Sequence, residues 1–281
     1  MKLVVVGCRG MLGSDLVEAC AAAGGTATGL DLPEFDLTDP GLVESALPAG
    51  DWVINCAAYT RVDDAECEKA RAYAVNADGA GHLARACAAR GAVLLHLSTD
   101  YIFDGRARKA CAEEDPPNPL NAYGASKLAG EQRVRDSGCA YLIVRTQSLF
   151  GRRGPNFVRS VAEKLRAGGG PLRVVNDQVS SPTYTRHLAA ALLNLVGRDC
   201  RGVVHVANSG ACTWFEFARA IADRVKPGAG IEPIRAEELA RPAIRPAYSV
   251  LDTGRYRAWT GATMPPWQDG LEAYLKEERL A

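Results

Sequence analysis

The first 150 residues alternate between two kinds of hydrophobic pattern. Four apolar runs, at 2–6, 26–30, 51–56 and 92–97, have the length of strands that are buried on both faces. Between these runs apolar residues recur three or four positions apart, as Leu12, Leu16 and Cys20 do, which is typical of amphipathic helices. Alternating strands and helices predict an α/β fold, a Rossmann-type doubly wound parallel sheet with right-handed crossovers.

The regular alternation of strand and helix patterns ends after Gly151. Helical spacing continues over 156–166 and 214–224, and the apolar run at 172–175 predicts a strand. Residues 187–196 and 203–207 are expected to return to the main sheet as a helix and a strand. The stretch 227–246 is rich in proline and is expected to be a winding loop.

These patterns predict two unequal units. We expect a dinucleotide-binding domain formed by residues 1–150 plus about 186–207. Residues 151–185 and 208–281 are expected to form a smaller, discontinuous α/β lobe that binds substrate, with the ligand held between the two units.

Composition narrows the class of protein. The 281 residues carry 33 basic and 33 acidic side chains, so no overall field favours nucleic acid or a membrane surface. No apolar run is long enough to span a bilayer. Nine cysteines without a Cys-x-x-Cys pair favour reduced thiols in the cytoplasm, and four scattered histidines predict no metal site.

Three glycines follow the first apolar run, at Gly7, Gly10 and Gly13, directly before a helical pattern. A strand, a glycine-rich turn and a helix form the context that a dinucleotide requires, because the helix N-terminus offers free N–H groups to the pyrophosphate. We expect cofactor contacts throughout this turn, including Arg9, Met11 and Leu12.

The second apolar run ends at Asp31, where a carboxylate normally accepts hydrogen bonds from the adenosine ribose and repels a 2′-phosphate. Arg9 favours the opposite choice, because its guanidinium can bind that phosphate. The sequence therefore favours NADPH but leaves NADH open. Asp36 and Leu37 are expected at the edge of the adenine.

Small and polar residues follow the third apolar run, at the carboxyl end of the predicted strand. We expect Ala57, Ala58, Tyr59 and Thr60 to lie along the cofactor. Thr99 ends the fourth run and therefore faces the same crevice.

Tyr123 and Lys127 stand four positions apart in a segment that reads as a helix from 123 to 135. This spacing places the phenol and the ammonium on one face, where a nearby cation would lower the pKa of the phenol. Such a tyrosine can donate a proton to a carbonyl oxygen. This spacing also arises by chance, so it indicates a reducing site only in combination with the glycine turn and Thr99.

The ordered set of motifs resembles the dTDP-4-dehydrorhamnose reductases, a family in the extended short-chain dehydrogenase/reductase superfamily. The resemblance covers nearly the whole chain. The motifs that carry it are the glycine turn, 57–60, 98–105, Tyr123 to Lys127, Arg145-Thr146, 156–158, Asp177-Gln178, 181–185, 214–217 and 245–251.

The resemblance implies a reductase that uses NAD(P)H on the 4-keto group of dTDP-4-dehydro-6-deoxy-L-hexose and yields dTDP-L-rhamnose. Thr99, Tyr123 and Lys127 would be catalytic, with Tyr123 as the general acid, and Asn76 would support the proton relay. The expected substrate contacts are Thr99, Asp100, Tyr123, Ser148, Asn156, Gln178, Thr183 and Arg245.

One departure concerns the substrate pocket. The family usually carries Ser-Trp after Arg-Thr, with the tryptophan beside the sugar, whereas this chain has Gln147-Ser148. Losing the aromatic wall widens or polarises the pocket, so the reaction class is better defined than the sugar.

Two alternatives to this reductase remain open. An epimerase or dehydratase of nucleotide sugars is disfavoured because Thr99 is followed by Asp100-Tyr101 and not by Asp-Glu. A non-catalytic, nucleotide-binding regulatory subunit is disfavoured by the intact Thr99, Tyr123 and Lys127. Some relatives pair through Mg²⁺, but the sequence shows no acidic cluster for it and leaves monomer and homodimer open.

Overall fold

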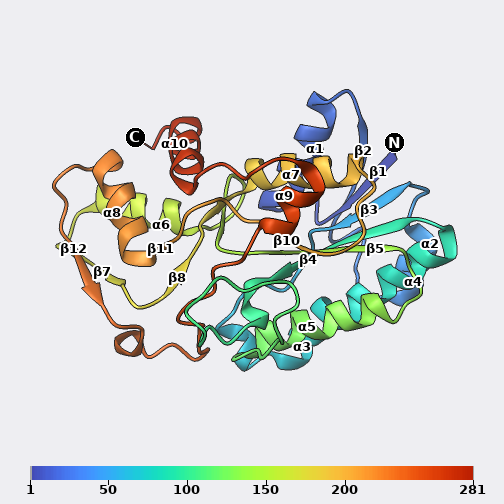
Figure 1. Cartoon of the computed structure of the whole chain (residues 1–281), viewed down its shortest axis with the longest axis horizontal. Coiled ribbons are helices and arrows are strands. Elements are labelled where there is room, and N and C mark those ends of the chain that lie inside the picture. The colour runs from blue at the N-terminus through green and yellow to red at the C-terminus, as the bar shows by residue number, and fades with distance from the viewer. Residues whose placement is uncertain (1, 281) are drawn as a thin grey trace.

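A computed structural model describes residues 2–280 of the chain. Its central sheet contains six parallel strands in the order β10-β5-β4-β3-β1-β2 (Figure 1). The strands are β1 (Lys2–Val6), β2 (Thr26–Leu30), β3 (Trp52–Asn55), β4 (Val93–Thr99), β5 (Tyr141–Thr146) and β10 (Gly202–His205).

The strand order reverses at β1. Strand β2 lies on one side of β1, while β3 and the later strands lie on the other. In open parallel sheets a ligand binds outside the carboxyl ends of the strands at this reversal. The predicted doubly wound parallel sheet is confirmed, and the reversal points to the carboxyl ends of β1 and β3.

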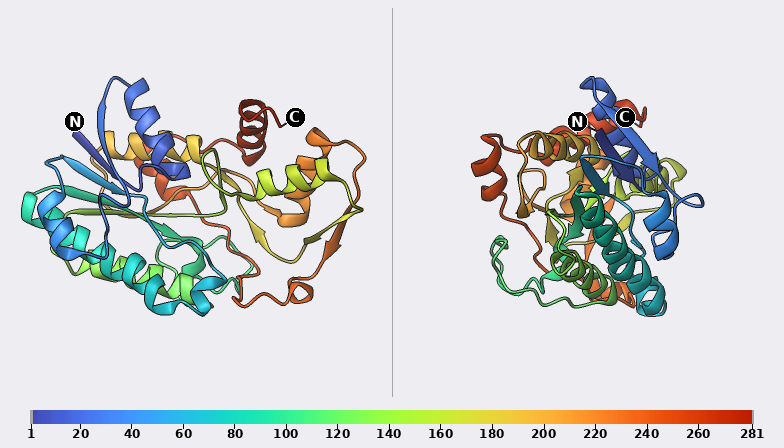
Figure 2. Two further views of the ribbon diagram at one scale, coloured as in Figure 1. Left: turned by 180° about the vertical axis from the view of Figure 1, so that it is seen from behind. Right: turned by 90° about the vertical axis from the view of Figure 1, so that its right-hand side faces the viewer.

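Helices cover both faces of the sheet (Figures 1 and 2). One face carries α1 (Met11–Ala22), α7 (Thr185–Gly197) and α9 (Gly254–Thr260). The other carries α2 (Pro40–Ala46), α3 (Lys69–Tyr73), α4 (Ala80–Arg90) and α5 (Ala122–Arg135), with a π-helical turn, Ala74–Gly79, joining α3 to α4.

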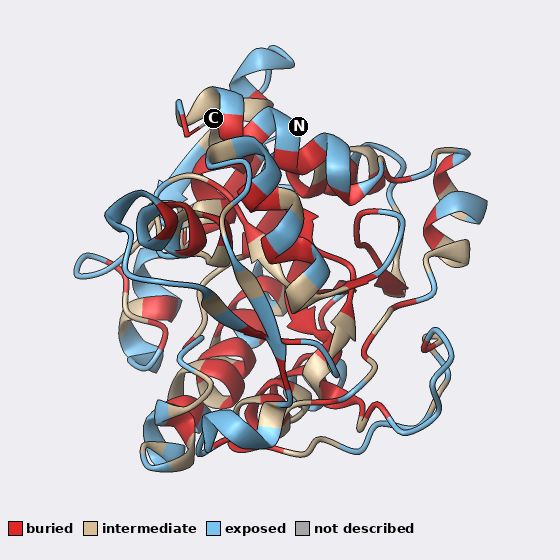
Figure 3. Cartoon of the chain, turned by 90° about the vertical axis from the view of Figure 1, so that its left-hand side faces the viewer, coloured by how far each residue is buried: buried red, intermediate tan, exposed pale blue. Residues whose placement is uncertain are grey.

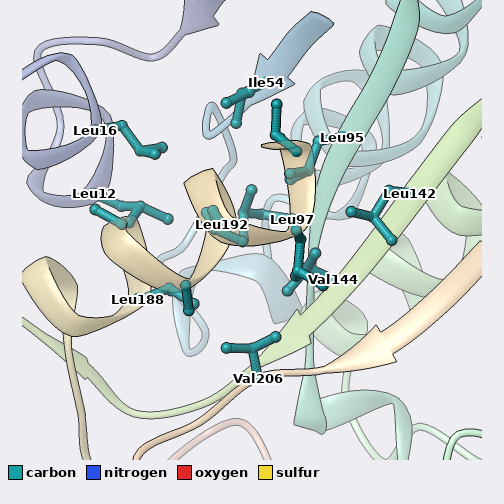
Figure 4. Packing of buried hydrophobic residues seen from close by; sticks show 14 of the residues in the cluster. Leu12, Leu16, Ile54, Leu95, Leu97, Leu142, Val144, Leu188, Leu192 and Val206 are labelled. Carbon is teal, nitrogen blue, oxygen red and sulfur yellow. The ribbon is translucent and has the colours of Figure 1, made fainter. Parts of the chain in front are cut away.

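The core under α1 and α7 holds the carboxyl edge of the sheet in place. Figure 4 shows Leu12 and Leu16 of α1 with Leu188 and Leu192 of α7, facing Ile54 and the strands beside it. Burying a leucine or isoleucine side chain stabilises a fold by about 1.5–3 kcal/mol. Strands β1, β3, β4 and β5 are buried along nearly their whole length, whereas the edge strand β2, expected to be buried, is mostly exposed (Figure 3).

A smaller lobe has its own hydrophobic core, in which Phe150, Phe217, Tyr184 and Tyr274 pack ring against ring. Its helices are α6 (Phe157–Ala167), α8 (Trp214–Val225) and α10 (Trp267–Glu277). Its short strands are β6 (Leu149–Phe150), β7 (Leu172–Val175), β8 (Val179–Ser180), β9 (Thr183–Tyr184), β11 (Cys212–Thr213) and β12 (Ile231–Ile234).

Two expectations for the second half differ from the structure. The proline-rich stretch 227–246 is not only a loop, because β12 pairs with β7 and a 3₁₀ turn, η4 (Ala236–Leu239), follows it. In its two-stranded sheet β12 has one neighbour, so it tolerates Pro233. Helix α9, expected in the smaller lobe, instead packs its Tyr256 into the core of the main sheet.

Arginines join the two lobes. Arg186 at the start of α7 contacts Glu277 of α10 at 2.6 Å and Glu18 of α1 at 3.3 Å. Arg152 also contacts Glu18 and lies 3.2 Å from Glu277. These ion pairs connect α1 of the main sheet to α10 of the smaller lobe.

Residues 2–280 contain neither a membrane-spanning helix nor a cluster of metal ligands. None of the helices in this range has the length and apolar character needed to cross a bilayer. Over the same range, no three histidine, cysteine, aspartate or glutamate side chains are grouped so that they could hold a metal ion.

The close packing of α1 on β1 gives a test of the fold. A Cβ at position 13 would lie 2.1 Å from the Gly7 carbonyl oxygen, so Gly13→Ala must push the helix away from the strand. We expect this variant to lose about 3 kcal/mol of unfolding free energy in urea denaturation. Gly197→Ala at the end of α7 is the control, because no atom lies within 4 Å of the added carbon. Equal stabilities of the two variants would contradict the packing argument.

Candidate active site

The glycine turn between β1 and α1 lies at the carboxyl edge of the sheet. Gly7 adopts φ +79, and a Cβ there would lie 2.7 Å from the Ala57 nitrogen at the end of β3. Gly10 begins α1 without a capping side chain, so the first N–H groups of the helix are open to a ligand. A carbon added at Gly10 would meet protein only at 3.4 Å, which leaves the space above the turn for the phosphates. This geometry fits a dinucleotide.

Arg9 and Asp31 lie together beside this turn. The Asp31 carboxylate accepts the Arg9 and Leu32 backbone N–H groups at 2.7 and 2.8 Å. The Arg9 guanidinium donates to the Leu32 carbonyl oxygen and lies 3.2 Å from Glu34, with its side chain 63% exposed. A cation and a carboxylate therefore border the position where the adenosine ribose would lie.

The expected adenine contacts lie after β2. The Asp36 carboxylate accepts hydrogen bonds from the Thr38 N–H and the Thr38 hydroxyl, both at 2.8 Å. Leu37 is buried, and its carbonyl oxygen lies 2.9 Å from His82 Nδ1.

The segment after β3 is tied to the helices beneath it by Asn76 on the π-helical turn. Asn76 accepts the Tyr59 N–H at 2.8 Å and donates to the Tyr59 carbonyl oxygen at 3.0 Å. It also donates to the Ser126 hydroxyl on α5 at 2.9 Å. Asn76 therefore fixes the position of Ala57, Ala58, Tyr59 and Thr60 relative to α5.

Thr99 ends β4 beneath the crevice. Its hydroxyl accepts the Tyr101 N–H at 3.2 Å and donates to Asp100 Oδ1 at 3.1 Å. Burial raises the pKa of the Asp100 carboxyl to about 7, although the Ser249 and Thr99 hydroxyls lower it. A buried carboxyl that titrates near neutrality next to Thr99 is typical of a functional site.

Helix α5 brings Tyr123 and Lys127 to the same place. Lys127 is buried and its Nζ donates to the Leu97 carbonyl oxygen at 2.6 Å, two residues before Thr99. The Thr99 hydroxyl is close enough to Tyr123 to lower the pKa of the phenol. The structure therefore brings Thr99, Tyr123 and Lys127 together.

The ionisation of Tyr123 differs from the sequence expectation. Burial raises the pKa of Tyr123 above its usual value and outweighs the effect of Thr99, and the nearby Asp100 and Tyr101 raise it further. Lys127 does not counter this shift, because its ammonium is directed to the backbone of β4. Tyr123 therefore keeps its proton at neutral pH, which suits a proton donor.

The wall where the family usually has a tryptophan is polar. Ser148 adopts φ 46 and its hydroxyl lies 2.8 Å from the Ser180 hydroxyl on β8. Gln147 is buried, and its amide donates to the Ser249 carbonyl oxygen at 2.8 Å and accepts the Leu251 N–H at 3.3 Å. Neither residue replaces the missing ring.

Three residues expected at the substrate also form hydrogen bonds within the fold. Asn156 caps α6 through the Arg159 N–H and donates to Tyr274 Oη. Thr183 is fully buried and accepts the Asn208 N–H at 3.2 Å. The Arg245 guanidinium forms two hydrogen bonds to Asp63, at 2.6 and 2.7 Å. Tertiary packing satisfied these polar groups in a way that the linear pattern could not indicate.

Gln178 lies half-buried in the loop between β7 and β8, next to a cavity of about 610 Å³. The cavity lies between the smaller lobe and the segment that follows Asp104. Two guanidiniums, those of Arg108 and Arg235, reach it from these two sides. The remaining lining residues are Asn176, Asp177, Pro233, Ile234, Glu238 and Ala247.

Sequence reasoning missed a buried ion pair behind Lys127. Glu131 accepts two hydrogen bonds from Arg145 of β5, at 2.9 and 2.8 Å. Its position four residues after Lys127 on the same helix was the available signal.

Comparisons with known proteins agree on one family. The family described as RmlD substrate binding domain matches residues 1–280. A dTDP-4-dehydrorhamnose reductase of Mycolicibacterium smegmatis is 43% identical over 96% of this chain and 84% of its own length. A probable dTDP-4,6-dihydroxy-2-methyloxan-3-one 4-ketoreductase of Streptomyces antibioticus is 39% identical over 96% of this chain and 93% of its own.

A solved structure agrees with these relatives. The dTDP-4-dehydrorhamnose reductase of Bacillus anthracis, in complex with NADP, superposes with a TM-score of 0.95 and 36% identity, and covers 98% of this chain and 99% of its own.

The raised pKa of Asp100 predicts a pH-dependent cost in stability. The carboxyl ionises near 3.8 in an ordinary environment and near 7 when buried, so the folded state is penalised above pH 7 and the penalty disappears as pH falls towards 4. Asp100→Asn should therefore stabilise the protein by about 4 kcal/mol at pH 8 and by less than about 1 kcal/mol at pH 4.

Thermal unfolding at the two pH values measures this effect. Asp223→Asn on the exposed face of α8 serves as the control and should change neither curve. A gain for Asp100→Asn of the same size at both pH values would show that titration of Asp100 is not its source.

Proposed function

Because the chain belongs to the dTDP-4-dehydrorhamnose reductase family, we propose that it reduces the 4-keto group of dTDP-4-dehydrorhamnose with NAD(P)H and yields dTDP-L-rhamnose. The observation that carries the proposal is the convergence of Thr99, Tyr123 and Lys127 at the sheet edge beside the glycine turn. A reducing site needs a proton donor and a cofactor cradle side by side, and this edge has both.

The residues divide the chemistry among them. When bound, the nicotinamide supplies hydride to the carbonyl carbon. Tyr123, which keeps its proton because it is buried, donates that proton to the carbonyl oxygen. The Thr99 hydroxyl lies beside Tyr123 and hydrogen-bonds the same oxygen as negative charge develops. Lys127 holds the nicotinamide ribose and keeps a positive charge near the phenol.

We propose that the nucleotide part of the substrate binds in the cavity between the smaller lobe and the segment after Asp104. Its lining includes Arg108 and Arg235, which suit an anionic diphosphate, and Ala247 at one end. From Ala247 the chain runs to Ser249, whose hydroxyl lowers the pKa of Asp100 next to Thr99. A ligand along this path would reach from the cavity towards the reacting groups. Asp100 and Gln178 stay in the proposed contact set, and Asn156, Thr183 and Arg245 stay in it with the added role of bonding within the fold.

A related 4-keto sugar is the second candidate substrate. The relative from Streptomyces antibioticus is named as a ketoreductase of a different dTDP sugar. Ser148 stands where the family usually has tryptophan, and its hydroxyl turns towards β8, so this wall of the pocket is open. Turnover of both sugars, compared as kcat/KM, decides between them.

NADPH is the proposed cofactor, with NADH accepted more weakly. The exposed Arg9 guanidinium can bind a 2′-phosphate once it leaves Glu34, whereas Asp31 already accepts two N–H groups. All nine cysteines are free thiols, which agrees with the proposed work in the cytoplasm. A monomer or a homodimer is compatible with this site.

Removing the Tyr123 hydroxyl tests the reaction. Tyr123→Phe should lower kcat for NADPH oxidation with dTDP-4-dehydrorhamnose by on the order of a hundredfold, since the general acid is lost. NADPH binding, followed by its fluorescence, should stay within about twofold. Tyr73→Phe on the exposed end of α3 is the control and should keep normal turnover. Near-normal turnover of the Tyr123 variant would rule out its role as the acid.

Removing the Arg9 charge tests the cofactor preference. Arg9→Gln should raise KM for NADPH about tenfold, because a charged hydrogen bond to the 2′-phosphate is lost, and leave KM for NADH nearly unchanged. Arg224→Gln on α8 removes an exposed arginine far along the chain and controls for overall charge. If Arg9→Gln weakens both cofactors equally, Arg9 does not select the phosphate.

A further inference from the structure

One face of α5 carries a third charged group behind the two reacting ones. Tyr123, Lys127 and Glu131 are spaced four residues apart, so they follow one another along the same side of the helix. Glu131 is 1% exposed and Lys127 is 2% exposed. Two opposite charges on consecutive turns are therefore both buried.

Glu131 is anchored by Arg145. Arg145 Nε and Nη2 donate to the two Glu131 oxygens at 2.9 and 2.8 Å, and Nη1 donates to the Glu113 carbonyl oxygen at 3.1 Å. The same Nη1 lies 3.3 Å from His205 Nε2. Burial lowers the pKa of His205 to about 3, so the imidazole is neutral and accepts this bond.

The ion pair between Glu131 and Arg145 connects α5 to the strands that end at the site. Arg145 of β5 is the register partner of Ser98 of β4, directly before Thr99. The Ser98 hydroxyl also lowers the pKa of Glu131, as Arg145 does, and together they keep this carboxyl ionised despite its burial. The negative charge behind Lys127 is therefore permanent at neutral pH.

Burial lowers the pKa of Lys127 to about 8, and Glu131 and then Cys56 oppose this shift. The groups that face Lys127 are Glu131 of α5, Cys56 after β3 and His96 of β4. Burial raises the pKa of the Cys56 thiol to about 12 and lowers that of His96 well below its usual value, so both are neutral. Of these three groups, Glu131 alone carries charge at neutral pH.

We propose that Glu131, anchored by Arg145, is a positioning residue that keeps the buried Lys127 side chain protonated next to Tyr123. This inference rests on the proposed function in one respect, namely that Lys127 takes part in turnover. Glu131 touches neither substrate nor cofactor, and it works through Lys127. The ion pair with Arg145 holds the carboxylate in the core, one helical turn after Lys127.

The consequence is a limit to activity at high pH. Lys127 acts in its protonated form, so kcat/KM falls as pH rises through the pKa of Lys127. Glu131→Gln keeps the size of the side chain but removes its charge, and it should move this fall to lower pH by about one unit. We expect kcat/KM to drop about fivefold at pH 8 and to stay within about threefold of the parent at pH 6.

A control and a second variant separate this role from a merely structural one. Asp136→Asn removes an exposed carboxylate at the end of the same helix and should not move the pH profile. The double variant Glu131→Gln with Arg145→Met removes both buried charges, which avoids an unpaired arginine in the core. It should show the same shift to lower pH as Glu131→Gln. A uniform loss at every pH in both variants, or an unshifted profile, would overturn the proposal.

A second measurement does not depend on turnover. The rate of cyanate carbamylation of Lys127, read by peptide mass spectrometry over a pH series, reports the fraction of neutral amine. The midpoint should fall by about one unit in Glu131→Gln. If the parent lacks reductase activity but the midpoint still moves, the proposed function fails and the inference about Lys127 stands. If the parent is active and the midpoint does not move, the inference fails alone.

Discussion

The close approach of α5 to the end of β4 is the constraint on which the site depends. A Cβ at Gly124 would lie 2.2 Å from the Tyr101 carbonyl oxygen, so only glycine lets the helix come this near. At this distance Lys127 reaches the Leu97 carbonyl oxygen and Tyr123 comes next to Thr99. A helix displaced by one side chain would separate Tyr123 from the Thr99 hydroxyl.

Burial sets the protonation states of the side chains at this site. The same loss of water raises the pKa of Tyr123 and of Asp100 and lowers that of Lys127. The phenol thus keeps its proton, while the lysine would lose its own without a compensating charge. Glu131 supplies that charge from behind the site. The result is an acid that stays protonated and a cation that stays charged within one dry region.

The two lobes have different tasks. The main sheet and α5 carry the glycine turn, Thr99, Tyr123 and Lys127, and hydrophobic cores pack on both faces of this sheet. The smaller lobe adds Ser148, Gln178 and a cavity bordered by two arginines. Arginine pairs to Glu18 and Glu277 hold the lobes together near α1 and α10. The proposed chemistry therefore lies at the regular main sheet, and the proposed sugar contacts lie on the more irregular smaller lobe.

The local sequence was sufficient to predict the features that depend only on residues near one another in the chain. The Gly7 to Gly13 turn and the Tyr123–Lys127 spacing need only neighbouring residues, and they identified the sheet, the cofactor edge and the reacting groups. Only the tertiary structure decided how distant polar groups are used. Asp63 pairs with Arg245 across 182 residues, and Glu131 of α5 pairs with Arg145 of β5. Desolvation and long-range pairing depend on which atoms exclude water, and no linear spacing contains that information.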